Sequence, residues 1–143
     1  MEKELILLDD LAPDEGDIIE GVRVITAKNC EQALDLLKER SDRIRWVVVD
    51  LGVPQGGWQR SRYLKEPGLA LLRQLKAEYG SELDVAATSF LLDESRCAAL
   101  RTMEIPDDRV FSKRSFAFRE MVRVLSGGVR EVQADAEEAE END

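Results

Sequence analysis

The stretch RWVVVDLGVP, residues 45–54, decides the fold class of this 143-residue chain. Its residues Trp46–Val49 form an apolar run that ends at an acidic side chain, Asp50. A nearly continuous apolar run is typical of a strand buried on both faces, as in parallel sheets that are covered by helices. We therefore predict a buried parallel strand with Asp50 at its carboxyl end.

Four further short apolar runs share this character and alternate with longer amphipathic segments. This alternation is the pattern of a parallel sheet with covering helices. Besides Trp46–Val49, the predicted strands are Glu4–Leu8, Val22–Thr26, Val85–Thr88 and Val110–Ser112.

Apolar residues recur with the 3.6-residue period of a helix in four of the other segments. The first helix follows a capping box formed by Asn29 and Gln32, and the second begins at Pro67, a favoured first-turn residue. The third lies within Asp93–Met103, and the fourth follows Ser115.

The connection between the first two predicted strands is too short for a full covering helix. It has eleven residues, Leu11–Gly21, including Pro13 and Gly16, whereas a parallel crossover normally takes about a dozen residues or more. We expect at most a helical turn around Asp14–Ile19.

The formal net charge of −10 is concentrated at the carboxyl terminus. Residues 131–143 hold seven acidic and no basic residues, which leaves −3 for the rest of the chain. We expect one domain over residues 1–128 and a disordered acidic tail over residues 129–143, since the tail has little apolar surface to bury. The domain shows no basic patch, so direct binding of nucleic acid is not expected.

No stretch is long and apolar enough to cross a bilayer, and Met1–Glu4 carries no signal-peptide pattern. We therefore expect a cytoplasmic protein without a membrane partner. Cys30 and Cys97 fall on the apolar faces of predicted helices, and the chain has no histidine. Both cysteines are expected to be buried, reduced thiols.

Polar residues stand where the predicted strands end, and this pattern indicates a site. Asp9 and Asp10 follow the first strand, Asp50 the third, Thr88 the fourth and Lys113 the fifth. In open α/β sheets, sites form outside the carboxyl ends of the strands. Three carboxylates need a counter-charge, and Mg²⁺ prefers oxygen ligands. A phosphoryl group between Mg²⁺ and Lys113 would be neutralised from both sides.

This set of residues, each after a strand and in this order, resembles the response-regulator receiver family of two-component signalling. The sequence from Asp50 to Pro54 is similar to the family's acceptor aspartate with a proline four residues on, and Pro67–Lys76 resembles the start of its third helix. The resemblance covers roughly residues 4–125. It implies a flavodoxin-like, doubly wound, five-stranded parallel sheet of order 2-1-3-4-5, here with the first helix shortened or absent.

The resemblance also implies a role for each position. Asp50 would be the nucleophile that accepts a phosphoryl group from a sensor histidine kinase or a phosphotransfer protein. Asp9, Asp10 and Asp50 would hold Mg²⁺ together with the backbone carbonyl of Gly52. No other cofactor is implied.

Lys113 would pair with a phosphoryl oxygen, and Thr88 would turn inward to hydrogen-bond the phosphoryl group. The small side chain of Ser89 would leave room for it. Such a domain is a switch that acts on a downstream protein rather than an enzyme.

Four features depart from the family. Besides the missing first helix, Arg114 stands where a proline usually follows the lysine, and Val110 replaces an aromatic residue that moves on phosphorylation. The loop after Asp50 is also several residues longer than usual and carries Trp58 and Tyr63 among basic residues. It is either a mobile insertion or a partner surface or lid.

Two alternative functions stay open at this point. One is a degenerate receiver that binds partners without being phosphorylated. The other is an aspartate-nucleophile phosphatase of the haloacid-dehalogenase type. That chemistry needs a second aspartate two residues after the nucleophile, where this chain has Gly52.

Overall fold

A computed structural model describes residues 3–10, 17–19 and 21–127 of the chain. Its strands are β1 (Glu4–Leu8), β2 (Asp17–Ile19), β3 (Val22–Ala27), β4 (Ile44–Asp50), β5 (Asp84–Ser89) and β6 (Val110–Ser112). Its α-helices are α1 (Cys30–Glu39), α2 (Pro67–Tyr79) and α3 (Glu94–Thr102), and short 3₁₀ turns are η1 (Gly80–Glu82) and η2 (Asp107–Arg109). Residues 118–127 are also helical. None of the helices in this part of the chain is long and apolar enough to span a membrane.

The strands form one sheet of order β2-β3-β1-β4-β5-β6. The pairs β3–β1, β1–β4, β4–β5 and β5–β6 are all parallel. These five strands correspond to the five predicted from the sequence, and their spatial order confirms the flavodoxin-like order 2-1-3-4-5.

The segment before β3 differs from the prediction. Asp17–Ile19 forms β2, which pairs antiparallel with β3, so the helical turn expected there is wrong for these residues. The rest of that expected turn, and the acidic tail at 129–143, lie outside the described residues. A three-residue strand satisfies the outer backbone groups of β3 without the length that a helix would need.

The predicted helices are confirmed together with their starts. Asn29 caps α1, because its side-chain oxygen accepts the Gln32 backbone N–H at 2.9 Å. Gln32 in turn accepts the N–H of Lys28 at 2.8 Å. Asp93 caps α3 in the same manner, through the N–H of Arg96, and Pro67 begins α2.

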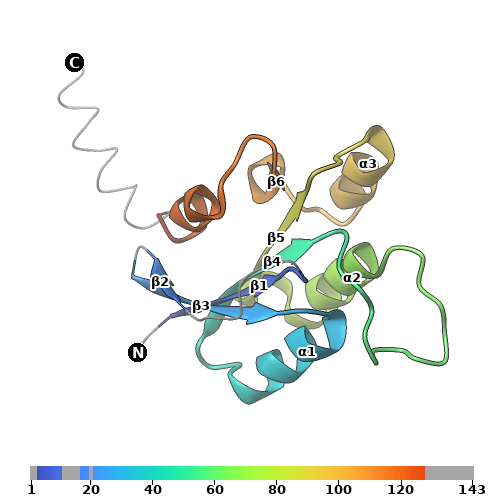
Figure 1. The fold of residues 1–143 in the computed structure, drawn as a ribbon, viewed down its shortest axis with the longest axis horizontal. Helices are drawn as coiled ribbons and strands as arrows, with labels where there is room; N and C mark the ends of the chain where they lie inside the picture. The colour runs from blue at the N-terminus through green and yellow to red at the C-terminus, as the bar shows by residue number, and fades with distance from the viewer. Residues whose placement is uncertain (1–2, 11–16, 20, 128–143) are drawn as a thin grey trace.

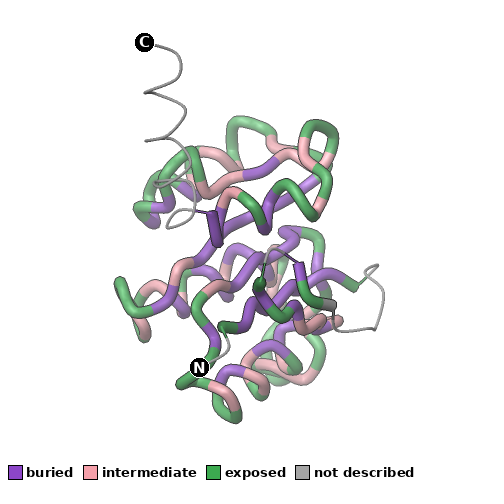
Figure 2. The backbone as a smooth tube through the Cα atoms, turned by 90° about the vertical axis from the view of Figure 1, so that its left-hand side faces the viewer, coloured by how far each residue is buried: buried purple, intermediate pink, exposed green. Residues whose placement is uncertain are grey.

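Side chains alternate between the two faces of the sheet and build a separate core on each. One core packs α1, α2 and α3 against residues such as Val47, Val49 and Ala87. The other packs the helix at 118–127 against residues such as Leu7 and Val48. Figure 1 shows α1 and α2 on one side of the sheet and the orange helix on the other, and Figure 2 shows the central strands buried.

The two cysteines differ in burial. Cys30 lies fully inside the first core, as predicted, whereas Cys97 on α3 is only half-buried. Burial raises the pKa of the Cys30 thiol to about 12, so this thiol stays protonated near neutral pH.

Candidate functional site

Four predicted site residues lie on the same face of the sheet, because side chains two residues apart along a strand point to the same face. Ala86 in β5 and Phe111 in β6 belong to the second core. Thr88 and Lys113 come two residues after them and therefore lie on the face of that core. The same step leads from Leu7 to Asp9, and Asp50 lies directly beside Thr88 in the β4–β5 ladder.

Lys113 binds two of the carboxylates at once. Its Nζ lies 2.6 Å from Asp9 Oδ2 and 2.6 Å from Asp50 Oδ2. All three side chains are largely buried, with 11–13% of each exposed. Burial alone would lower the pKa of Lys113, but the hydrogen bonds that its ammonium donates to Asp50 and Asp9 outweigh burial and raise this pKa above its ordinary value.

Asp10 joins this group from the exposed side. One carboxylate oxygen from each of Asp9, Asp10 and Asp50 can be chosen such that all lie within 4.8 Å of one another. Three carboxylates beside one ammonium leave an excess of negative charge. A hard cation fits this donor set, since Mg²⁺ and related ions take carboxylate oxygens and complete their shell with carbonyls and water.

Gly52 contacts Asp50: its backbone N–H donates to Asp50 Oδ1 at 2.9 Å. A Cβ at this position would lie 3.5 Å from that oxygen, an ordinary contact, so steric exclusion does not demand glycine. The predicted role of the Gly52 carbonyl as a metal ligand stays a prediction.

Thr88 is the one buried polar side chain that lacks a hydrogen-bond partner among the described residues. It is 0% exposed, and its Oγ1 contacts no donor or acceptor. Such a buried hydroxyl costs about 1–3 kcal/mol if it stays unpaired, and it calls for an explanation. A phosphoryl oxygen at Asp50 would supply the missing partner.

A hydrogen-bond network beside the site escaped the sequence analysis. Arg96 on α3 donates to Ser89 Oγ at 3.0 Å and to Glu66 Oε1 at 2.8 Å. Glu66 is the residue before α2, so the network joins the end of the long loop to the loop after β5. Ser89 is buried, and its hydroxyl is held by the bond from Arg96. That its small side chain leaves room for a phosphoryl group stays a prediction.

The long loop after Asp50 is held by one of its own side chains. The Gln55 amide donates to the carbonyls of Trp58, Gln59 and Arg62, and its oxygen accepts the N–H of Leu64. These bonds fix the loop's shape, so it is not an unstructured insertion.

The loop's contacts lead away from the carboxylates. Trp58 packs against the core of α1 and α2, and Arg60 lies 3.7 Å from Glu31 on α1. In this structure Arg60 therefore pairs with α1 rather than with the acidic cluster, and Tyr63 is 87% exposed.

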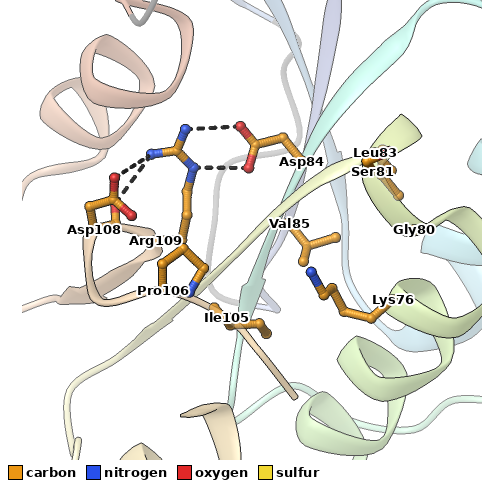
Figure 3. Close-up of a pocket in the computed structure, with 10 residues that line it drawn as sticks. All are labelled: Lys76, Gly80, Ser81, Leu83, Asp84, Val85, Ile105, Pro106, Asp108 and Arg109. Carbon is orange, nitrogen blue, oxygen red and sulfur yellow. Dashed lines mark hydrogen bonds and ion pairs between the residues drawn. The ribbon is translucent and has the colours of Figure 1, made fainter. Parts of the chain in front are cut away.

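A cavity of about 340 Å³ lies at the end of the sheet opposite to the three carboxylates (Figure 3). Arg109 forms a two-bonded pair with Asp84 there, at 2.9 and 3.0 Å, and also contacts Asp108. Because the charges of this cavity are largely paired with one another, it resembles structural packing more than a reaction site.

Comparison with solved structures agrees with the fold. A response regulator from Thermotoga maritima matches at a TM-score of 0.59 and 18% identity, over 88% of this chain and 97% of the other. One from Burkholderia pseudomallei, solved with a phosphorylated aspartic acid, a calcium ion and citrate, matches at 0.60 and 20%, over 99% and 75%. The Mn²⁺-bound response regulator Rcp1 matches at 0.56 and 16%, over 87% and 90%. The chain has the receiver-domain fold of response regulators.

The sequence identity to these structures is low, so the comparison rests on the fold. No protein-family model matches the sequence, and no curated protein matches it significantly. In this chain β2 lies in the connection where the sequence leaves no room for a full helix.

Proposed function

We propose that this chain is a signalling receiver in which Asp50 accepts a phosphoryl group. The observation that carries the proposal is the arrangement around Asp50. One carboxylate oxygen binds Lys113, the other accepts the Gly52 N–H, and the unpartnered Thr88 hydroxyl lies on the adjacent strand. A phosphoryl group on Asp50 would need a cation to neutralise its charge and a hydrogen-bond donor for its oxygens. Lys113 and Thr88 are suited to these two tasks.

Each neighbouring side chain has a task in this proposal. Asp50 attacks the phosphorus of the donor, and an acyl phosphate forms as the donor's bond to phosphorus breaks. Lys113 neutralises part of the charge of the transferred group. Thr88 donates its hydroxyl hydrogen to a phosphoryl oxygen, which replaces an unpaired buried group with a charge-assisted hydrogen bond.

Asp9, Asp10 and Asp50 would hold Mg²⁺, and the bound ion would supply further neutralisation of the phosphoryl charge. The support is the donor set itself, an excess of carboxylates with ligand atoms within 4.8 Å of one another. A response regulator of the same fold was solved in an Mn²⁺-bound form, and another was solved with a phosphorylated aspartic acid and a calcium ion.

The partners follow from the same proposal. The phosphoryl donor would be a sensor histidine kinase or a phosphotransfer protein in the cytoplasm, and the output would be a contact with a downstream protein. The chain would act as a phosphorylated switch and not as an enzyme with an external substrate.

The direct test is labelling with acetyl phosphate and Mg²⁺, read by intact-protein mass spectrometry and by mapping of the modified residue. We expect one phosphoryl group on Asp50 and none on Asp50→Asn. Asp35→Asn, which neutralises an exposed carboxylate on α1, is the matched control and should label like the unaltered chain. Absence of labelling in a folded, Mg²⁺-supplied chain would instead favour a phosphorylation-independent interaction module.

A further inference from the structure

A cavity of about 190 Å³ adjoins the acidic cluster on the sheet face that carries the helix at 118–127. Asp9, Thr88 and Lys113 form its polar end. Phosphoryl transfer at Asp50 needs these polar groups, but it does not need the apolar space that extends from them.

That apolar space has aromatic walls. Phe116, Phe118 and Met121 line it from the chain after β6. Phe116 packs edge-on against Phe111 in the core, with ring centroids 5.2 Å apart and an interplanar angle of 74°. Phe90 forms the outer rim, 59% exposed, with its ring 5.1 Å from Lys113 Nζ. Aromatic rings and a thioether are favourable neighbours for another aromatic ring.

The cavity exists because the two sheet faces are covered unequally. Three helices contribute to the first core, whereas within the described ranges only the segment at 118–127 contributes a helix to the second. This helix covers only part of a face that spans several strands, and the aromatic residues around it leave space beside β1 and β5.

The polar end of this space contains a group that still needs a partner. Thr88 Oγ1 is completely buried, lines the cavity and has no hydrogen bond. Asp9 and Lys113 are paired with each other, and Lys113 also binds Asp50, so the charged side chains at this end already have partners. The free capacity for hydrogen bonding is therefore that of a neutral hydroxyl.

We propose that this cavity binds a neutral single-ring aromatic molecule with one hydroxyl group, of the phenol class, whose hydroxyl oxygen accepts the hydroxyl hydrogen of Thr88. The size agrees, because an apolar cavity of about 150 Å³ accommodates benzene. A charged ligand would be unfavourable, since its charge would lose its hydration in a cavity with mainly apolar walls.

The ligand and the phosphoryl group would both require Thr88. This coupling rests on the proposed function, in which Thr88 donates to a phosphoryl oxygen. Because one hydroxyl hydrogen cannot serve both, each ligand must weaken the binding of the other by the same factor. The cavity would thus let a small aromatic molecule hold the switch in its unphosphorylated state.

The chain offers internal probes for a direct test. Its three methionines include Met121 in the cavity wall and Met103 in the opposite core. We would titrate the full chain with phenol, and separately with toluene, and follow the methionine methyl signals by NMR. The expected result is a saturable shift at Met121 with little change at Met103, and tighter binding of phenol than of toluene.

The variant Thr88→Val keeps the shape and removes the hydroxyl. It should weaken phenol about fivefold, the effect of one hydrogen bond, and leave toluene unchanged. Thr102→Val, on the exposed side of α3, is the matched control and should change neither affinity. Since Thr88 is unpaired in the structure, the valine variant is expected to fold, which its thermal unfolding would verify.

Three results would overturn the proposal: no shift at Met121 at millimolar phenol, equal shifts at Met121 and Met103, or the same loss of both ligands in Thr88→Val. The coupling is tested by adding beryllofluoride and Mg²⁺, which should weaken phenol about fivefold. If beryllofluoride binds and phenol affinity is unchanged, the coupling is wrong. If beryllofluoride does not bind while phenol does, the proposed function fails and the cavity proposal stands.

Discussion

At the amino end of the sheet Arg109 meets Asp84 through two hydrogen bonds, whereas at the carboxyl end Lys113 meets Asp9 and Asp50 together. The buried carboxylate of Glu4 at the same end is also paired with a guanidinium, because Nη1 of Arg40 donates to both of its oxygens. The amino end matches each carboxylate with a guanidinium. The carboxyl end has more carboxylates than cations, and an unpartnered hydroxyl beside them.

The two ends of the sheet show that charged residues of the same types can stabilise the fold at one end and form a candidate functional site at the other. A two-bonded guanidinium–carboxylate pair leaves little for a further ligand to do. An excess of buried negative charge stores repulsion that a cation or a cationic contact can release, which is how functional sites lower stability.

The largest expected effect concerns chemistry and separates the two ends. Asp50→Asn should abolish labelling by acetyl phosphate, because an amide cannot act as the nucleophile, while Asp84→Asn at the amino end should label normally. Intact-protein mass spectrometry measures both. Equal labelling of the two variants would show that Asp50 is not the acceptor.

The next effect concerns stability and should appear at the amino end. Asp84→Asn removes the charge from a partly exposed pair with Arg109, so we expect a loss of about 1 kcal/mol in the free energy of unfolding. Urea denaturation, followed by circular dichroism, measures it. An unchanged midpoint would mean that the pair contributes no net stability.

A smaller effect of opposite sign is expected at the carboxyl end. Without Mg²⁺, Asp10→Asn should raise the melting temperature by about 1–3 °C, because it relieves repulsion with Asp9 and Asp50. Millimolar Mg²⁺ should stabilise the unaltered chain, through binding to the folded state, and should stabilise the variant much less. A variant that melts lower without metal would contradict the repulsion.

The smallest expected effect tests whether solvent reaches the core beneath the carboxyl end. Cys30 is fully buried with its pKa raised to about 12, so iodoacetamide at pH 8 should spare it while the half-buried Cys97 is alkylated first. Peptide mapping after a short reaction distinguishes the two. Rapid labelling of Cys30 would indicate that the loop at 51–66 opens.

The five parallel strands and the placement of Asp9, Asp50, Thr88 and Lys113 could be predicted from the sequence. Buried parallel strands have a local signature, and the side chain at the end of such a strand follows from the two-residue alternation. The distances between the four residues add the detail that one lysine binds two aspartates.

Other features depend on tertiary contacts that no local pattern encodes. The strand Asp17–Ile19 is too short to carry a periodic signal. It forms because the outer edge of β3 has backbone groups with which it can pair. The bonds from Arg96 to Ser89 and Glu66 join residues that are far apart in sequence. The hydrogen bonds from the Gln55 side chain to backbone carbonyls of its own loop depend on the folded conformation of that loop.

Both outermost strands of the described sheet, β2 and β6, have three residues, whereas the strands between them have five to seven. A sheet edge is a template on which another extended chain can add by backbone hydrogen bonding, and a short edge offers few such bonds. The long apolar strands of this sheet are thereby kept away from strand addition. We therefore expect self-association of the folded chain to proceed through side-chain surfaces and not through fibril-like extension of the sheet.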